Sequence, residues 1–327
     1  MNYKEAYERF DALFENRLST EEATNLLVEL YKKGESFEEI AAAAKVMREH
    51  SLKLELEPSL RDEIIDIVGT GGDRSGTFNI STTVSIVLAS LGCKVAKHGS
   101  GSATSKSGSA DVLKSLGLNL NMSIEKQIKM LKECGFVFMF AMNHHPCMKH
   151  IMPIRRSLPH RTIFNILGPL ANPAGAQKQI VGVFSIDYIE RFSRALNKLG
   201  TKRSMVVGSL DGLDEVSICD ISRYVLIENG ILHAGEIDPQ KYGLKLSSLD
   251  SIRGGESDVN AQITRDILLG KDKGARRDIV LLNGACALFV DGKARDIQEG
   301  IEMMSYAIES KKSWEKLSEI IKLSYLA

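Results

Sequence analysis

An α/β fold with a small helical unit at its N-terminus is predicted by three features of the sequence. The chain has 327 residues, enough for two domains, and 43% of them are hydrophobic, enough for a core. The first 60 residues carry only helix signals. From residue 63 onwards, short apolar runs alternate with helical patterns and glycine-rich loops, which is typical of a parallel sheet. We therefore expect a helical domain over residues 1–62 and a large α/β domain with a mainly parallel central sheet over residues 63–327.

The N-terminal helices are predicted by their caps. Residues 3–14 form an amphipathic pattern. Ser19 with Glu22, and Ser36 with Glu39, have the spacing of a capping box before an apolar run, so a helix is expected to begin at each serine. Pro58 is expected to end this helical run.

The α/β part is predicted element by element. Strands are expected at residues 64–68, 94–96, 136–141, 180–184 and 205–208, and helices at 80–91, 110–116, 123–133 and 187–199. Asn229-Gly230 suits a type I′ turn, so residues 224–227 and 231–234 should form a hairpin. From residue 258 the chain is expected to be helical, including residues 297–309 and 314–323.

Composition excludes several classes of protein. Lys plus Arg and Asp plus Glu both number 42, so the net charge is zero and no general nucleic-acid-binding surface is expected. The longest apolar run, residues 279–290, is shorter than the ~20 residues of a membrane span. The five cysteines are widely spaced and never form C-x-x-C, which favours free thiols in a cytoplasmic protein. The histidines lack the spacing of a zinc site.

The first candidate site is the glycine-rich turn after the first strand. Gly69, Gly71 and Gly72 let backbone N–H groups approach an anion, and the helix after Asn79 adds a positive dipole end. The turn matches neither phosphate-loop nor dinucleotide-binding spacing, because Arg74 stands where a third glycine would be. The turn therefore has two possible roles. It binds a phosphate or diphosphate, or it is only a tight turn between a strand and a helix.

A second loop, residues 97–109, follows the next strand. It holds six hydroxyl side chains, three glycines and two lysines. Such tracts are often solvated linkers. Ligands of parallel sheets, however, bind at the carboxyl ends of neighbouring strands, which favours phosphate binding by both loops.

Asp214 and Glu215 form a third candidate, after an apolar strand and a glycine turn. Adjacent carboxylates suit Mg²⁺, especially beside a polyphosphate, although an acidic surface turn is the alternative. Arg155, Arg156 and Arg161 provide either an anion clamp or a solvated helix face.

Together these stretches resemble the anthranilate phosphoribosyltransferase family. The matching segments cover nearly the whole chain and are residues 69–73, 79–82, 97–99, 106–113, 161–173 (RTIFNILGPLANP), 213–217, 242–244 and 253–261. The resemblance implies the nucleoside-phosphorylase-like phosphoribosyltransferase fold, and a homodimer joined through the helical domain. It also implies that a segment near residues 144–175 packs at the helical domain and the hinge.

The resemblance further implies the activity. The enzyme would transfer the phosphoribosyl group of 5-phosphoribosyl-1-diphosphate (PRPP) to anthranilate, giving N-(5-phosphoribosyl)anthranilate and diphosphate, in tryptophan biosynthesis. Magnesium would be the cofactor, as two ions. No discrete acid/base pair is implied, because anthranilate brings its own amine.

The site residues implied by position fall into three groups. PRPP would be bound by Gly69, Gly72, Asp73, Thr77, Asn79, Ser81, Thr82, Lys97, Ser105 and Ser109. Magnesium would be held by Ser81, Asp214 and Glu215. Anthranilate would face Gly69, His98, Ser100 and Arg155.

The sequence departs from the family pattern in the second loop. The family usually has Lys-His-Gly-Asn-Arg, where this chain has Ser100 and Gly101 after Gly99. A serine is shorter than asparagine and has fewer donors. The family also usually has glycine where Pro159 stands. Two alternatives remain at this stage: a paralogue with another acceptor, similar to pyrimidine nucleoside phosphorylases, and a non-catalytic protein that binds polyanions.

Overall fold

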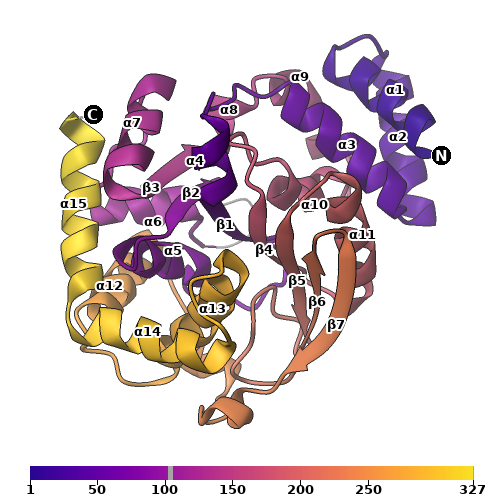
Figure 1. Cartoon of the computed structure of the whole chain (residues 1–327). Helices are drawn as coiled ribbons and strands as arrows, with labels where there is room; N and C mark the ends of the chain where they lie inside the picture. Colours follow the sequence, from indigo (N-terminus) through magenta and orange to yellow (C-terminus); the bar gives the residue numbers. More distant parts are fainter. Residues whose placement is uncertain (102–105, 327) are drawn as a thin grey trace.

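A seven-stranded sheet forms the centre of the molecule, as seen in a computed structural model that describes residues 1–101 and 106–326 (Figure 1). The strand order within these residues is β3-β2-β1-β4-β5-β6-β7. The strands are β1 (Ile64–Gly69), β2 (Lys94–Gly99), β3 (Phe136–Phe140), β4 (Lys178–Gly182), β5 (Arg203–Ser209), β6 (Ser222–Glu228) and β7 (Ile231–Ile237).

The first five strands are parallel and the last two are antiparallel, so the predicted mainly parallel sheet is confirmed. Asn229 and Gly230 both have positive φ, 51° and 84°, and form the predicted hairpin turn between β6 and β7. Strand β2 is longer than predicted, because Lys97 and His98 pair with β3. These two residues therefore belong to a strand and not to the loop.

The N-terminal helices are α1 (Tyr3–Phe14), α2 (Thr20–Lys33) and α3 (Phe37–Glu49). Both predicted capping boxes are present, at Ser19 and at Ser36. The prediction that Pro58 ends a helix is wrong: α3 ends nine residues earlier, and Pro58 begins the short helix α4 (Pro58–Glu63). Proline suits the first position of a helix, because its missing N–H has no partner there and its φ is already helical.

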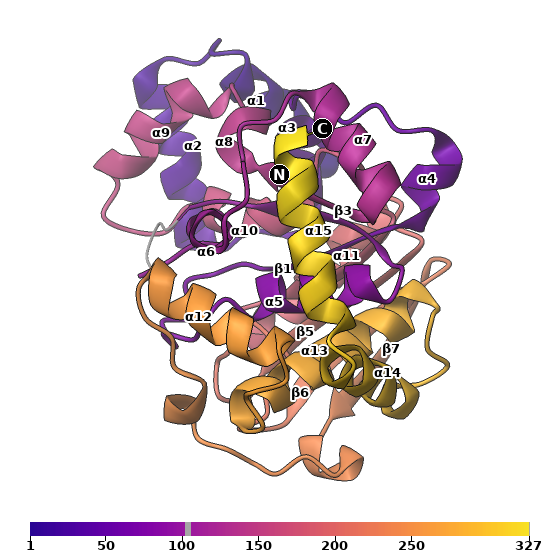
Figure 2. The ribbon, with the colours of Figure 1, turned by 90° about the vertical axis from the view of Figure 1, so that its left-hand side faces the viewer.

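Helices cover both faces of the sheet. One face packs on α5 (Ile80–Ser90), α7 (Ile124–Cys134) and α13 (Ala275–Asp291). Further helices pack on these or on one another and share the same core: α6 (Ser109–Leu116), α12 (Ser257–Leu268), α14 (Ile297–Glu309) and α15 (Lys312–Leu326). Figure 2 shows α15 running across this face beside α7. The other face packs on α11 (Ile189–Lys198), preceded by the 3₁₀ turn η2 (Ile186–Tyr188), and shares its core with α1–α3.

The remaining elements are short. They are α8 (Ala141–His144), α9 (Met148–Ser157), α10 (Phe164–Leu167) and the 3₁₀ turns η1 (Gly168–Leu170), η3 (Pro239–Tyr242) and η4 (Leu249–Ile252). Buried residues of α9 and α10, such as Ile151 and Leu167, lie in one core with those of α1–α3. Among the helices that the structure describes, none is long and apolar enough to cross a bilayer.

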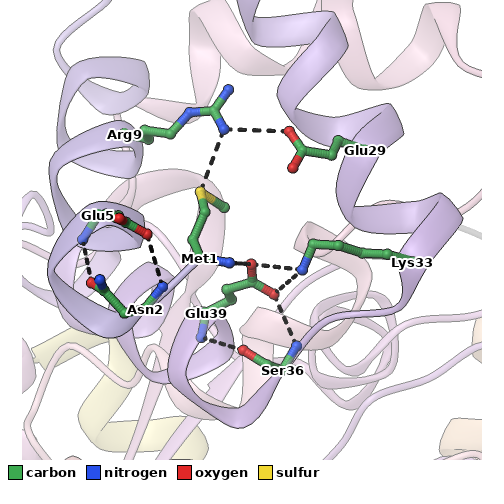
Figure 3. A network of polar contacts seen from close by, with 8 residues as sticks. All are labelled: Met1, Asn2, Glu5, Arg9, Glu29, Lys33, Ser36 and Glu39. Atoms are coloured by element: carbon green, nitrogen blue, oxygen red, sulfur yellow. Dashed lines mark hydrogen bonds and ion pairs between the residues drawn. The ribbon is translucent and has the colours of Figure 1, made fainter.

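Glu39 is a fully buried carboxylate at the centre of a polar network in the helical region (Figure 3). Lys33 Nζ lies 2.6 Å and the Met1 ammonium nitrogen 2.9 Å from its oxygens, and the Ser36 N–H donates to it over 3.0 Å. Burial alone would raise the pKa of Glu39, but these donors together lower it. The network therefore stabilises the charged carboxylate and links the end of α2 to the start of α3.

We expect Glu39→Gln to lower the free energy of unfolding by about 2 kcal/mol at pH 7, as for loss of a hydrogen bond to a charged group. Because the pKa of Glu39 is lower in the folded than in the unfolded chain, its contribution is present above the unfolded pKa of ~4.3. It is lost as the pH falls through the folded pKa, so the two proteins should converge in acid. Urea unfolding as a function of pH measures this difference.

The matched control is Glu22→Gln. Glu22 occupies the same capping-box position in α2, but it is exposed and has no lysine partner among the described residues. It should cause a smaller loss. Equal losses for both variants would show that only the cap matters, and not the buried network.

Candidate active site

Three loops meet at the carboxyl edge of the parallel strands. The Gly71 N–H, after β1, donates to Asp214 Oδ2, after β5, over 2.6 Å. A Cβ on Gly69 or on Gly182 would collide with Asp214, so both strands must end in glycine for this contact to form. The sequence therefore brings the glycine-rich turn and the acidic pair together, although 143 residues separate Gly71 from Asp214.

Three carboxylates gather where these loops meet. Burial raises the pKa of Asp214 to about 7, and the neighbouring charge of Asp73 contributes to this rise. Burial and the charge of Asp214 raise the pKa of Glu215 to about 8. Asp73 Oδ2 is buried and has no hydrogen-bond partner in the part of the chain that the structure describes. A group of oxygen ligands that repel one another, one of them without a partner, fits a divalent cation.

Lys97 lies beside the acidic group, with 1% of its surface exposed. Its ammonium group donates to Ile67 O of β1 over 2.5 Å and to Ser81 Oγ of α5 over 3.2 Å. Burial lowers the pKa of Lys97, while Asp66 and Glu215 act in the opposite direction. An ammonium group has three donors, so these two bonds leave one for an anionic ligand.

The start of α5 carries the next polar groups. Asn79 Nδ2 donates to Ser107 O over 3.3 Å, which ties this helix to the end of the second loop. The backbone N–H of Ser81 lies near Glu215 and acts to lower the pKa of that carboxyl, against the larger effect of burial. The Thr82 hydroxyl is buried without a hydrogen-bond partner among the described residues. Ser109 begins α6 and lies against Gly99, the last residue of β2.

A cavity of about 310 Å³ opens beside these groups. Its wall combines the glycine turn, the end of the second loop and the segment before α12. The lining residues are Gly72, Asp73, Arg74, Ser75, Gly76, Thr77, Lys106, Ser107, Arg253, Gly254, Gly255 and Asn260. Three cationic side chains, Arg74, Lys106 and Arg253, therefore surround a space with backbone amides from two glycine-rich segments, which suits a polyanion.

Comparison with known proteins identifies the family. Residues 61–313 match the "Glycosyl transferase family, a/b domain" and residues 1–51 its "helical bundle domain". The anthranilate phosphoribosyltransferase of Methanobrevibacter smithii is 44% identical over 98% of this chain and 94% of its own length. The chain belongs to the anthranilate phosphoribosyltransferase family.

Solved structures of this family share the fold. The anthranilate phosphoribosyltransferase of Thermus thermophilus superposes with a TM-score of 0.91, at 37% identity, over 99% of this chain and 96% of that one. The Saccharomyces cerevisiae enzyme, solved in complex with PRPP and Mg, gives a TM-score of 0.86 at 28% identity, over 97% and 91% of the two chains. The same yeast enzyme has also been solved with 4-fluoroanthranilate.

Of the residues that the family resemblance assigns to anthranilate, Gly69 lies against Asp214, and the other three make their contacts outside the acidic group. His98 Nδ1 lies 3.1 Å from Gly168 O, and the Arg155 guanidinium lies 5.5 Å from the ring centre of Phe164. Both therefore contact the α10–η1 segment, Arg155 at the start of α10 and His98 at the start of η1. Ser100 is exposed, and its hydroxyl donates to Gly101 O within the loop. Ser105 lies outside the described residues.

His98 and His145 form a buried pair whose protons can be assigned. A carbonyl only accepts, so His98 Nδ1 donates to Gly168 O. Burial lowers the pKa of His98 to about 3 and that of His145 to about 4, so both rings are neutral. His98 Nε2 must then accept from His145 Nε2, which lies 3.2 Å away. His145 Nδ1 is left as an acceptor, and it has no partner among the described residues.

Several residues of the site have no clear signal in the sequence. The sequence shows Arg161 as part of a basic cluster and at the start of the segment 161–173, but assigns it no contact; its guanidinium donates to Gly72 O and lies 4.4 Å from the ring centre of Phe184. Arg253 and Asn260 line the cavity. Their place depends on long-range packing, and the only available signal is that residues 253–261 resemble the family.

We expect Gly182→Ala to lower the free energy of unfolding by about 1–3 kcal/mol, because its Cβ would overlap the Asp214 backbone and displace the acidic segment. Gly168→Ala is the matched control. A Cβ on Gly168 meets nothing within 4 Å, and the φ of this residue is −48°. Urea unfolding compares them, and equal stability of both variants would contradict the close contact with Asp214.

Proposed function

We propose that this member of the family transfers the phosphoribosyl group of PRPP to anthranilate, with both substrates bound at the carboxyl edge of the sheet. The observation that supports this most directly is the convergence of Asp73, Asp214 and Glu215 with Lys97 beside a cavity lined by cations and glycine amides. The yeast relative solved with PRPP and Mg adds support from the same fold.

The proposed PRPP site has two parts. The glycine turn with Thr77 binds one end of the substrate, and the start of α5 with Lys97 binds the diphosphate. Its residues are Gly69, Gly72, Asp73, Thr77, Asn79, Ser81, Thr82, Lys97, Ser105 and Ser109. Arg161 acts on this site through the Gly72 carbonyl, whose position it fixes.

Magnesium is the proposed cofactor, bound as two ions. Ser81, Asp214 and Glu215 would hold it, and Asp73 lies beside them with a buried oxygen that has no partner among the described residues. When bound, magnesium would neutralise charge on the diphosphate and so improve it as a leaving group.

The chain's own groups have a clear task in the transfer. As the bond to diphosphate breaks, negative charge grows on the leaving oxygens, and the Lys97 ammonium and the amides of the glycine turn stabilise it. The amine of anthranilate is already a nucleophile, so the site needs to position it and not to activate a side chain. Gly69, His98, Ser100 and Arg155 form the proposed anthranilate site, where Arg155 supplies the positive charge.

Other parts of the assignment are also proposals. We place the protein in the cytoplasm, as a homodimer joined through residues 1–62, and light scattering tests the dimer. The division at residues 62 and 63 stays a prediction. A different acceptor, or polyanion binding without catalysis, is less favoured because the sequence relatives and solved structures compared above are anthranilate phosphoribosyltransferases.

Purified protein tests the activity directly. We expect it to convert anthranilate in the presence of PRPP and Mg²⁺, to lose activity in EDTA, and to regain it with Mg²⁺. Glu215→Gln should reduce turnover at least tenfold, because it removes one charged ligand. Asp220→Asn, an acid six residues after Asp214 and outside the acidic group, is the control. Full turnover in metal-free buffer would exclude the magnesium role.

The serine at position 100 gives a separate prediction. Ser100→Asn with Gly101→Arg, which restores the usual family residues, should lower the KM for anthranilate about fivefold, the effect of one hydrogen bond of ~1 kcal/mol. The KM for PRPP should change little. The arginine would also lie near Asp111, since a Cβ on Gly101 is 3.5 Å from that carboxylate. Each single variant serves as a control, and an unchanged KM for anthranilate would remove Ser100 from the acceptor site.

A further inference from the structure

Asn260 is a buried polar residue of α12 that lines the edge of the cavity and is hydrogen-bonded to Asn79 of the proposed diphosphate site. Only 2% of its surface is exposed, and it is bonded at both ends of its amide. We infer that Asn260 is a positioning residue that sets the orientation of the Asn79 side chain and thereby the affinity for PRPP. This inference rests on the proposed function, because it takes Asn79 as a diphosphate ligand.

Hydrogen bonds fix the orientation of the Asn260 side-chain amide and, through it, that of the Asn79 amide. The Gly255 N–H donates to the oxygen of Asn260 over 2.7 Å, so the Asn260 nitrogen must point the other way. That nitrogen donates to Asn79 Oδ1 over 2.9 Å. Asn79 must therefore present its oxygen to Asn260 and its NH₂ group to Ser107, whose carbonyl lies 3.3 Å away. Asn260, which donates to the Asn79 oxygen over the shorter distance, and the Ser107 carbonyl, which accepts from its nitrogen, together fix the orientation of this amide.

Close packing holds Asn260 in this place. A Cβ on Gly254 would lie 2.6 Å from Asn260 Oδ1 and 2.7 Å from the Phe78 backbone. The Gly254 N–H also donates to Gly76 O over 2.9 Å, and Arg253 pairs with Thr77 in an isolated bridge. The segment before α12 is therefore clamped to the loop that precedes Asn79, and Asn260 cannot move independently of it.

Loss of Asn260 should therefore weaken the binding of PRPP more than it slows the transfer step. The two faces of an Asn amide have nearly the same shape but opposite polarity, so without Asn260 the Asn79 side chain could turn its oxygen toward the anion. An oxygen there repels a diphosphate that an N–H would bind. Loss of a contact made equally in the ground and transition states raises KM and leaves kcat nearly unchanged.

The packing of α12 on α5 offers a matched control. Thr264 is one turn after Asn260, and its hydroxyl bonds that of Thr83, which is one turn after Asn79, over 2.8 Å. Both threonines are buried at the same helix contact. Thr264→Val therefore removes one hydrogen bond between the same two helices. It leaves both bonds of the Asn79 side chain in place, and Thr83 can keep its own bond to the Asn79 backbone carbonyl.

The test compares Asn260→Ala with Thr264→Val. We expect Asn260→Ala to raise the KM for PRPP about tenfold, with kcat and the KM for anthranilate within about twofold of the unaltered protein. Calorimetry with inorganic diphosphate and Mg²⁺ should show the same tenfold loss of affinity. Both variants should lower the melting temperature by a similar amount. Thr264→Val, however, should leave the KM for PRPP and the affinity for diphosphate unchanged. An equal rise in KM for both variants would mean that Asn260 is merely structural.

A double variant tests the route through Asn79. In the Asn79→Ala background, Asn260→Ala should cause no further rise in the KM for PRPP, and a tenfold additional rise would overturn the inference. If Asn260→Ala does not fold, Asn260→Asp replaces it in the same comparison, because it keeps the bond from Gly255 but cannot donate to Asn79. If the unaltered protein shows no turnover, the proposed function fails, and diphosphate binding alone then decides the role of Asn260.

Discussion

The buried ammonium group of Lys97 is the point on which the arrangement of the site depends. An unpaired charge inside a protein is costly, so its neighbours must compensate for the lost water. They come from three elements: a carbonyl of β1, a hydroxyl of α5, and the charges of Asp66 and Glu215. Since the pKa of Lys97 is still lowered on balance, this compensation is incomplete. A further anion beside Lys97 would improve its environment, so the site is suited to binding one.

Close to the buried positive charge of Lys97 lies a group of carboxylates without enough positive charge around it. Burial and, after it, repulsion among Asp73, Asp214 and Glu215 raise the pKa values of Asp214 and Glu215. The folded chain maintains this arrangement because Gly69 and Gly182 leave room for the acidic segment and the Gly71 N–H holds it. A cation and a polyanion that bind together would relieve both imbalances. In the proposed function, the two charged groups are halves of one site for a metal–diphosphate complex.

Much of the fold could be predicted from sequence because its signals are local. The capping boxes of α2 and α3 and the Asn-Gly turn of β6–β7 each act within a few residues, and all are present in the structure. The start of α4 is not predictable in this way, because proline both ends and begins helices, and only packing decides which. The contacts of Arg161 with Gly72 and of Asn260 with Asn79 span 89 and 181 residues. No periodicity or motif carries such pairings.

In the proposed anthranilate site, too, the available charge depends on which buried side chains are ionised. His98 and His145 are joined by one hydrogen bond of fixed direction and are neutral, since their pKa values of about 3 and about 4 lie well below neutral pH. They can supply hydrogen-bonding geometry but no positive charge. In the proposed site, a carboxylate-bearing acceptor must therefore find its cation in Arg155. Burial lowers the pKa of Arg155, and it has no ion-pair partner among residues 1–101 and 106–326. Its guanidinium resembles Lys97 in being a buried or partly buried cation whose pKa burial lowers, but Lys97 has the charges of Asp66 and Glu215 nearby, whereas a substrate carboxylate would be the counter-charge of Arg155.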